Sequence, residues 1–122
     1  EKADEDSKIG DAFTIAEFVM GVNETTEADL PETVLAWDLV RAVNMARWAF
    51  ICGYINEDEM WEAIRTTAGI AKESFNSWEE YGNSFAVGRG IWRGETDDYE
   101  TADEVVGALL NKEDSPWKAI EW

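Results

Sequence analysis

The segment AWDLVRAVNMARWAF, residues 36–50, constrains the fold more than any other part of the chain. At about 100° per residue, one side of a helix over this segment carries only apolar residues, which predicts that this side packs in a core. These residues are Leu35, Leu39, Ala42, Val43, Ala46 and Phe50. The other half mixes apolar and polar residues. We therefore expect a helix over about 32–52 that is mostly buried and lies at the centre of the fold.

Four polar residues, Asp38, Arg41, Asn44 and Arg47, recur at every third position on that other half. Because each step of three residues turns backward by about 60°, all four cannot line one pocket. Neighbours can still pair, Asp38 with Arg41 and Asn44 with Arg47. A buried arginine needs a partner such as Asp38, Glu59 or Glu62, and Trp side chains can stack on it. We predict a structural layer of ion pairs and stacking, and the alternative is an anionic ligand held by Arg41 or Arg47.

Apolar spacing and capping patterns predict an all-α fold of about five helices in one domain over 11–122, after a flexible acidic tail over 1–10. A first helix is expected from about Asp11 to Gly21. Further helices are expected over about 32–51, after Asn56, after Ser77 and after Thr101. The closing SPWKAIEW is expected to pin its large apolar residues onto the body of the domain, namely Trp117, Ile120 and Trp122.

Small residues recur every four positions in the fourth of these helices, at Gly82, Ala86 and Gly90. Each glycine costs about 1 kcal/mol relative to alanine inside a helix, so some interaction must offset that cost. We predict that the small residues allow a second helix to approach closely. A ligand groove along this face is the alternative.

Composition narrows the possible functions. The chain has 122 residues with 45% hydrophobic content and a net charge of −17, which predicts a folded domain that repels nucleic acid and anionic membranes. No apolar run approaches the ~20 residues of a membrane-spanning helix, so we expect a soluble protein. The chain starts at Glu1 rather than Met, which leaves open a removed leader. The oligomeric state is not predicted.

Residues that usually carry chemistry are sparse. The chain has no His, and its single Cys52 in FICGY is predicted to be a buried apolar residue. The acidic segment GETDDYE carries Asp97, Asp98 and Glu100, which lack the spacing of a calcium loop and are expected to be solvated in a loop. The sequence therefore predicts no catalytic set, no metal site and no cofactor.

Three stretches, AWDLVRAVNMARWAFICGYINEDEMWEAI, SWEEYGNSFAVGRGIW and SPWKAIEW, resemble the bacterial family catalogued as domain of unknown function number 1266. The resemblance covers about residues 35–93 and the last eight residues. It implies no reaction, ligand or cofactor. The residues that match the family pattern are Trp37, Asp38, Arg41, Asn44, Arg47, Trp78, Gly88, Arg89 and Trp92.

The sequence favours an uncharacterised, non-enzymatic helical domain that binds or regulates another protein, with a basic protein as the expected partner. The alternative is a small anionic-ligand binder, or a hydrolase that uses carboxylates such as Asp38, Glu59 or Glu62. A weaker alternative is an immunity- or inhibitor-type protein whose acidity blocks a basic active site. The candidate ligand or partner residues are Asp38, Arg41, Asn44, Arg47, Trp48, Arg89 and Trp92.

Overall fold

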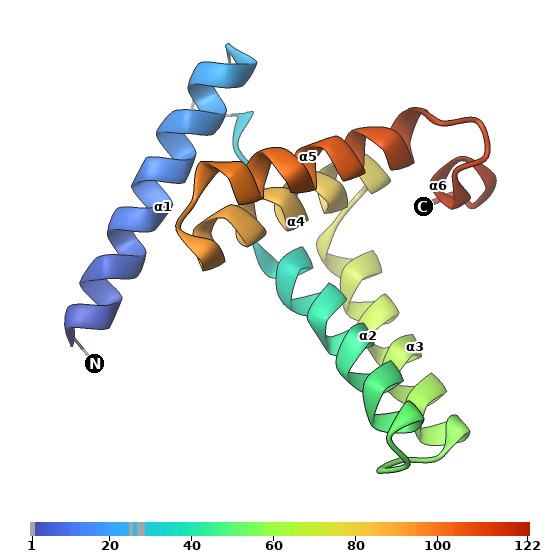
Figure 1. The fold of residues 1–122 in the computed structure, drawn as a ribbon. Coiled ribbons are helices and arrows are strands. Elements are labelled where there is room, and N and C mark those ends of the chain that lie inside the picture. The colour runs from blue at the N-terminus through green and yellow to red at the C-terminus, as the bar shows by residue number, and fades with distance from the viewer. Residues whose placement is uncertain (1, 25, 27–28) are drawn as a thin grey trace.

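The architecture is built from helices, as Figure 1 shows. The computed structural model describes residues 2–24, 26 and 29–122, and within them it contains six helices and no strand. The helices are α1 (Lys2–Asn23), α2 (Leu35–Ile51), α3 (Glu57–Ser74), α4 (Trp78–Arg93), α5 (Thr96–Asn111) and α6 (Pro116–Ala119). The all-α prediction is confirmed. The additional short helix α6 lies in the closing segment, where the Ser115 hydroxyl accepts a hydrogen bond from the Trp117 backbone N–H.

Two helices begin earlier than the sequence predicted. Helix α1 begins at Lys2, so most of the segment predicted as a flexible tail, residues 1–10, is helical. Lys8 ties these turns to the body, because its ammonium donates to the Trp92 backbone carbonyl at 2.9 Å. Helix α5 begins at Thr96, within the segment predicted as a loop. Its first turn carries Asp97 and Asp98, whose negative charges favour a helix N-terminus.

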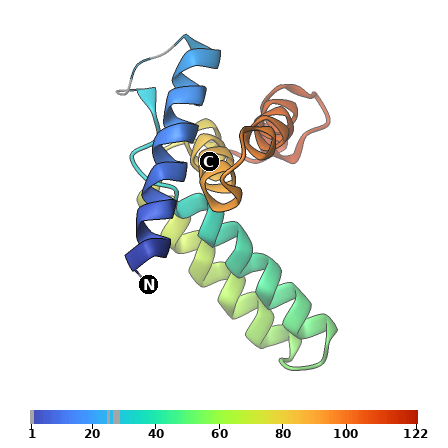
Figure 2. The same ribbon diagram turned by 60° about the vertical axis from the view of Figure 1, so that its left-hand side comes forward.

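Helix α4 lies at the centre of the fold, which corrects the prediction that the helix over 32–52 does so. Helices α1 and α5 pack against α4 on one side, and α2 packs against it on another (Figures 1 and 2). Buried residues in α4 are Gly82, Ser84, Ala86, Val87, Gly88 and Gly90. In α2 only Ala36, Leu39 and Ala46 are buried. The apolar stripe of α2 correctly predicted a packing face. The helix with the most buried residues, however, is α4, which is marked by its small residues.

The small residues of α4 permit close helix packing, as predicted. A Cβ atom built on Gly82 would lie 2.6 Å from Val106 of α5. One built on Gly90 would lie 3.0 Å from Tyr99 of α5 and 3.2 Å from Ile15 of α1. These distances leave no room for larger residues, so the glycines permit the core between α1, α4 and α5.

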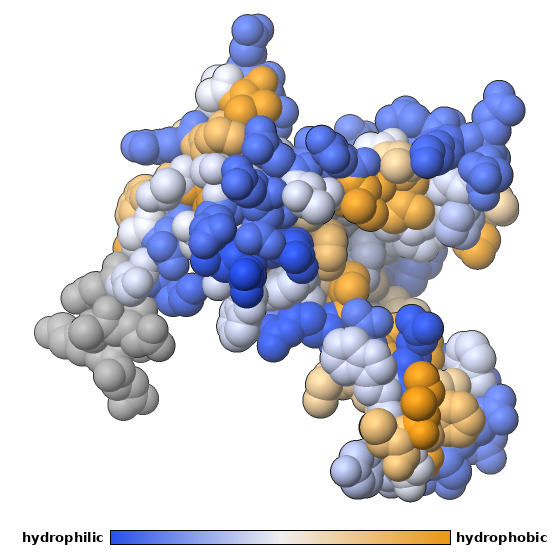
Figure 3. All heavy atoms as spheres, in the orientation of Figure 1, coloured by the Kyte–Doolittle hydropathy of each residue, from blue (hydrophilic) through white to orange (hydrophobic). Residues whose placement is uncertain are grey.

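Helices α2 and α3 form a hairpin that extends away from the other helices (Figures 1 and 2). The outer face of α2 is open to solvent, with Met45, Trp48 and Ile51 exposed by 63%, 58% and 73%. This corrects the prediction that the helix is mostly buried: α3 covers one side only, and α4 crosses near the N-terminal end of α2. Cys52 is exposed where the hairpin turns, rather than buried as predicted. Figure 3 shows hydrophobic residues on the hairpin surface.

The closing segment packs through its tryptophans. Trp117 stacks on Trp78 with ring centroids 4.9 Å apart, and the Trp122 indole N–H donates to the Phe75 carbonyl at 2.8 Å. The predicted contact of Ile120 is wrong for its side chain, which is 59% exposed. Its backbone carbonyl instead accepts a hydrogen bond from the Trp78 indole at 2.7 Å.

We predict opposite effects for two glycine substitutions. A Cβ on Gly88 would lie 2.5 Å from the Trp37 Cβ, so Gly88→Ala is expected to destabilise the protein by about 1–3 kcal/mol. Gly107 in α5 has no such neighbour within 4 Å, so Gly107→Ala is expected to stabilise by about 0.5–1 kcal/mol. Urea unfolding measures both. Equal effects would contradict the packing described for Gly88.

Candidate functional site

A cavity of about 610 Å³ opens between α2 and α4, where the two helices diverge. It is lined by Trp37, Asp38, Val40, Arg41, Ala42, Asn44, Met45, Trp48, Phe85 and Arg89. Five of the seven residues proposed from the sequence line this α2–α4 cavity. Trp92 lies beside it through Arg41, whereas Arg47 is exposed and does not line it. The three-residue spacing thus behaves as predicted: Asp38, Arg41 and Asn44 share the cavity and Arg47 does not.

Arg41 presents a largely available guanidinium to the cavity. Its central carbon lies 4.4 Å from the centroid of the Trp92 ring and 5.6 Å from that of Trp37. The predicted pair with Asp38 is present, with 3.6 Å between nitrogen and oxygen and exposed fractions of 45% and 66% for the two side chains. Because an exposed pair contributes about 0–1 kcal/mol to stability, the contact with Asp38 holds Arg41 only weakly.

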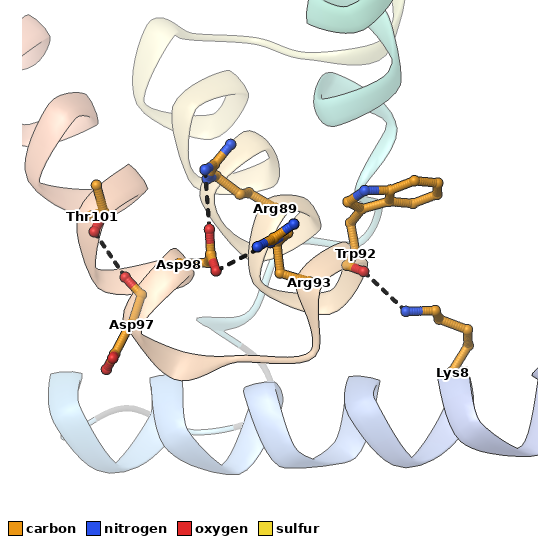
Figure 4. A network of polar contacts seen from close by, with 7 residues as sticks. All are labelled: Lys8, Arg89, Trp92, Arg93, Asp97, Asp98 and Thr101. Carbon is orange, nitrogen blue, oxygen red and sulfur yellow. Dashed lines mark hydrogen bonds and ion pairs between the residues drawn. The ribbon is translucent and has the colours of Figure 1, made fainter.

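Arg89 is held more firmly than Arg41. Its guanidinium lies 3.0 Å from one oxygen of Asp98, and the Arg93 Nε donates to the other oxygen at 3.4 Å. Figure 4 shows the Asp98 carboxylate between the two arginines. Asp98 is only 16% exposed, so this contact fixes the beginning of α5 against the end of α4. Asp97 and Glu100, by contrast, are exposed.

Trp37 connects the two arginines. The central carbon of the Arg89 guanidinium lies 5.8 Å from the centroid of the Trp37 ring, so both guanidiniums approach this indole. Its ring also packs against Phe85 with centroids 5.4 Å apart. The buried Trp37 indole N–H has no hydrogen-bond partner among the residues that the structure describes. Such an unpaired donor costs about 1–3 kcal/mol, which offsets part of the stability that the packing of this ring contributes.

Two arginines, Arg41 and Arg89, line the cavity, although the chain as a whole carries −17. Four of the ten basic residues belong to one network, because they share contacts with the Trp37 and Trp92 rings and with Asp98. They are Lys8, Arg41, Arg89 and Arg93. Within the part of the chain that the structure describes, their acidic partners are Asp11, Asp38 and Asp98. Figure 4 shows Lys8 of α1 reaching the Trp92 carbonyl of α4, and Arg89 and Arg93 of α4 reaching Asp98. Among the described residues, these contacts therefore join four basic side chains to three acidic ones.

Part of the cavity lining was not predicted from the sequence. Trp37, Met45 and Phe85 line the cavity but were not among the candidate ligand residues. The signal that could have found Trp37 is an alternating spacing of four and three, rather than three alone. The residues in this stripe are Trp37, Arg41, Asn44, Trp48 and Ile51.

Two other arrangements suggested from the sequence are not observed at this cavity. No hydrogen bond joins Asn44 to Arg47 within the described part of the chain. Glu59 belongs to the N-terminal cap of α3, where it exchanges hydrogen bonds with Asn56. Glu62 is exposed on the same helix. The carboxylates suggested for a hydrolase are therefore not brought together with Asp38 in the α2–α4 cavity.

A second, apolar cavity of about 310 Å³ lies between α3 and the closing segment. Trp78, Tyr81 and Trp122 form its aromatic side, and burial raises the pKa of the Tyr81 hydroxyl above its usual value. Within the described residues there is no group of three metal-ligating side chains and no helix long and apolar enough to cross a membrane. Of these two cavities, the α2–α4 cavity is the one lined by arginines, Arg41 and Arg89.

We predict that the two acidic partners of the arginines differ in their contribution to stability. Asp98→Ala removes a mostly buried carboxylate shared by two arginines, so it is expected to lower the free energy of unfolding by about 1–3 kcal/mol. Asp38→Ala removes an exposed partner and is expected to change it by less than about 0.5 kcal/mol. Thermal and urea unfolding check both values. An equally large loss of unfolding free energy for Asp38→Ala would show that the pair of Arg41 with Asp38 is structural.

Comparison with known proteins gives one match. A family model described as "Protein of unknown function (DUF1266)" matches residues 1–122. The match extends over the N-terminal helix, which the resemblance in sequence motifs had not reached. No curated protein and no solved structure matches the chain.

Proposed function

The chain belongs to the family of proteins of unknown function DUF1266, and because that description names no activity, we propose from the geometry that the chain binds a small aromatic anion in the α2–α4 cavity. The observation that carries this proposal is the weak pairing of the Arg41 guanidinium inside the cavity. Its guanidinium faces a cavity of about 610 Å³ and has only an exposed, 3.6 Å contact with Asp38. A cavity of this size falls within the ~300–1,000 Å³ that small-molecule sites occupy.

The ligand class follows from the lining. Arginine presents planar N–H donors that match a carboxylate or sulfonate, so the charged end of the ligand is expected beside Arg41. Trp37, Trp48 and Phe85 supply aromatic faces for stacking a planar ring. Asn44 adds one amide that can donate or accept. These groups together favour a flat molecule with one negative charge, such as an aromatic carboxylate.

Binding, rather than catalysis, is the function that this arrangement supports. General acid–base chemistry on a bound ligand needs a positioned proton donor or acceptor, often a pair of carboxylates. Asp38 is the carboxylate in the cavity, and it is 66% exposed. Glu59 is occupied at the cap of α3. The cavity therefore offers groups that hold an anion and stack on it.

We predict that Arg41→Met keeps the fold and weakens binding of naphthalene-2-carboxylate at least about tenfold, because it removes a charged donor worth about 1.5–3 kcal/mol. Isothermal titration calorimetry measures the affinity. The matched control is Arg65→Met, which removes an exposed arginine on α3, outside the cavity. A second control is naphthalene-2-carboxamide, which has the same ring without the charge.

The outcomes separate clearly. Preference for the carboxylate over the amide, lost in Arg41→Met and kept in Arg65→Met, supports the proposal. Equal binding of both ligands, or equal affinity of both variants, contradicts it. Circular dichroism establishes that each variant is folded.

A second candidate function is protein binding, which the exposed outer face of α2 favours. Met45, Trp48 and Ile51 are each more than half exposed, and Tyr54 in the hairpin turn is 84% exposed. Tryptophan, tyrosine, methionine and arginine are the residue types enriched in protein interfaces. This face is consistent with an interaction module, and it borders the α2–α4 cavity without depending on a ligand there.

A further inference from the structure

We propose that the apolar cavity between α3 and the closing segment binds a neutral, compact alicyclic molecule whose single oxygen accepts a hydrogen bond from Tyr81. This second site goes beyond the proposed anion binding and does not rest on it, because the two cavities share no lining residue among those that the structure describes. The volume of about 310 Å³ lies at the lower end of the ~300–1,000 Å³ typical of small-molecule sites. A small, compact molecule therefore matches the size of the apolar cavity.

The walls of the apolar cavity are held in place by hydrogen bonds between the closing segment and the helices. The Trp78 indole N–H donates to the Ile120 carbonyl at 2.7 Å, and the Trp122 indole N–H donates to the Phe75 carbonyl at 2.8 Å. Trp78 is also stacked on Trp117. The apolar cavity is therefore formed before a ligand arrives, so binding does not have to order its walls.

The lining of the apolar cavity holds water poorly. A buried water typically makes about two to four hydrogen bonds, whereas most of this lining is apolar, including Val43, Ile64 and Ala71. The Thr67 hydroxyl is already used, because it donates to the Ala63 carbonyl at 2.8 Å. Water in the cavity is therefore weakly held, and an apolar molecule that displaces it gains free energy.

The charges at the apolar cavity favour a neutral ligand. Among the described residues, two charged ones line the cavity, and Lys72 and Glu121 have opposite signs. The Lys72 ammonium lies 5.2 Å from the centroid of the Trp122 ring, so it already has an aromatic partner on the cavity wall. The described lining therefore carries no excess charge, whereas two arginines and one aspartate line the α2–α4 cavity.

The orientation of the aromatic rings favours a compact ligand over a flat one. The Trp78 and Trp122 rings are nearly perpendicular, with 82° between their planes, and the Tyr81 ring is tilted by 38° from that of Trp122. Because these rings form a corner rather than two parallel faces, a planar molecule cannot stack between them. A rounded ring system can contact several of these faces at once.

Tyr81 supplies a hydrogen-bond donor that the described residues leave unused. Burial raises the pKa of its hydroxyl above the usual value, so the group stays protonated at neutral pH and can donate. No hydrogen bond joins this hydroxyl to another group in the described part of the chain, whereas the Tyr99 hydroxyl accepts from the Asn23 amide at 3.3 Å. A carbonyl oxygen on the ligand would provide the missing acceptor. The molecule that combines these features is a neutral bicyclic ketone.

The first test is isothermal titration calorimetry of the full chain with camphor, a neutral bicyclic ketone. We expect the wild type to bind camphor, and Tyr81→Phe to weaken binding about two- to tenfold, because it removes one hydrogen bond. Ala68→Phe fills the cavity from an exposed position of α3 and is expected to abolish binding. The matched control, Thr66→Phe, places the same ring on α3 outside the lining and is expected to keep the affinity.

The second test locates each ligand through the nuclear magnetic resonance signals of the indole N–H groups. Camphor is expected to shift the signals of Trp78 and Trp122, which line the apolar cavity. Naphthalene-2-carboxylate is expected to shift those of Trp37 and Trp48, which line the α2–α4 cavity. Arg41→Met is expected to leave camphor binding unchanged. Camphor-10-sulfonate has the same ring system with a negative charge and is expected to bind more weakly than camphor.

Each result either supports or overturns the second site. Binding that is weakened in Tyr81→Phe, lost in Ala68→Phe and kept in Thr66→Phe supports it. A wild type without a heat of binding for camphor, an unchanged affinity in Tyr81→Phe or Ala68→Phe, or tighter binding of the sulfonate overturns it. A wild type that binds naphthalene-2-carboxylate but not camphor overturns this inference and leaves the proposed function intact. The reverse pattern overturns the proposed function alone.

Discussion

The fold depends on how closely other helices approach α4. Glycines at positions 82 and 90 let α5 and α1 pack directly on its backbone, and Gly88 does the same for Trp37 of α2. Between these contacts the buried Ser84 hydroxyl accepts from the Ala36 N–H and donates to the Thr33 carbonyl at 2.6 Å. These two bonds satisfy backbone groups at the beginning of α2, where no preceding turn can do so. One helix therefore sets the positions of three others.

The cavity is a consequence of where α2 is anchored. Its N-terminal end is fixed to α4 by Ser84 and Gly88, while its C-terminal half follows α3 into the hairpin. The side chains that line the resulting gap belong to two helices that separate at an angle. Arg89 reaches the gap from α4 but stays paired with Asp98, whereas Arg41 enters from α2 with a weak partner. The geometry divides the two arginines into a structural one and an available one.

Local signals in the sequence predicted local structure well. The cap at Asn56 with its return carboxylate from Glu59, and the cap at Ser77, both occur as hydrogen bonds in the structure. These patterns involve residues within four positions of each other, so nothing distant competes with them. The early beginning of α5 was missed because Asp98 is held there by arginines of α4, a contact between elements that composition does not reveal.

The site was only partly predictable for a related reason. The polar residues of α2 were recognised, and the geometric limit on their sharing one pocket was correct. The sequence did not predict which side of α2 would be left open, because that depends on the direction in which α4 crosses α2. Cys52 shows the same limit: its apolar neighbours suggested burial, but the hairpin turns at Gly53 and carries it into solvent.

The acidity of the chain makes the weak pairing of Arg41 notable. On a chain of net charge −17, an arginine with a weakly attached partner would find many carboxylates if its surroundings allowed it. Arg41 instead lies between two indole rings, which accept the face of a guanidinium and leave its N–H edge without a strong acceptor. Stacking thus orients the cation while the edge donors remain free. A group held in this way is prepared to meet an anion at its edge.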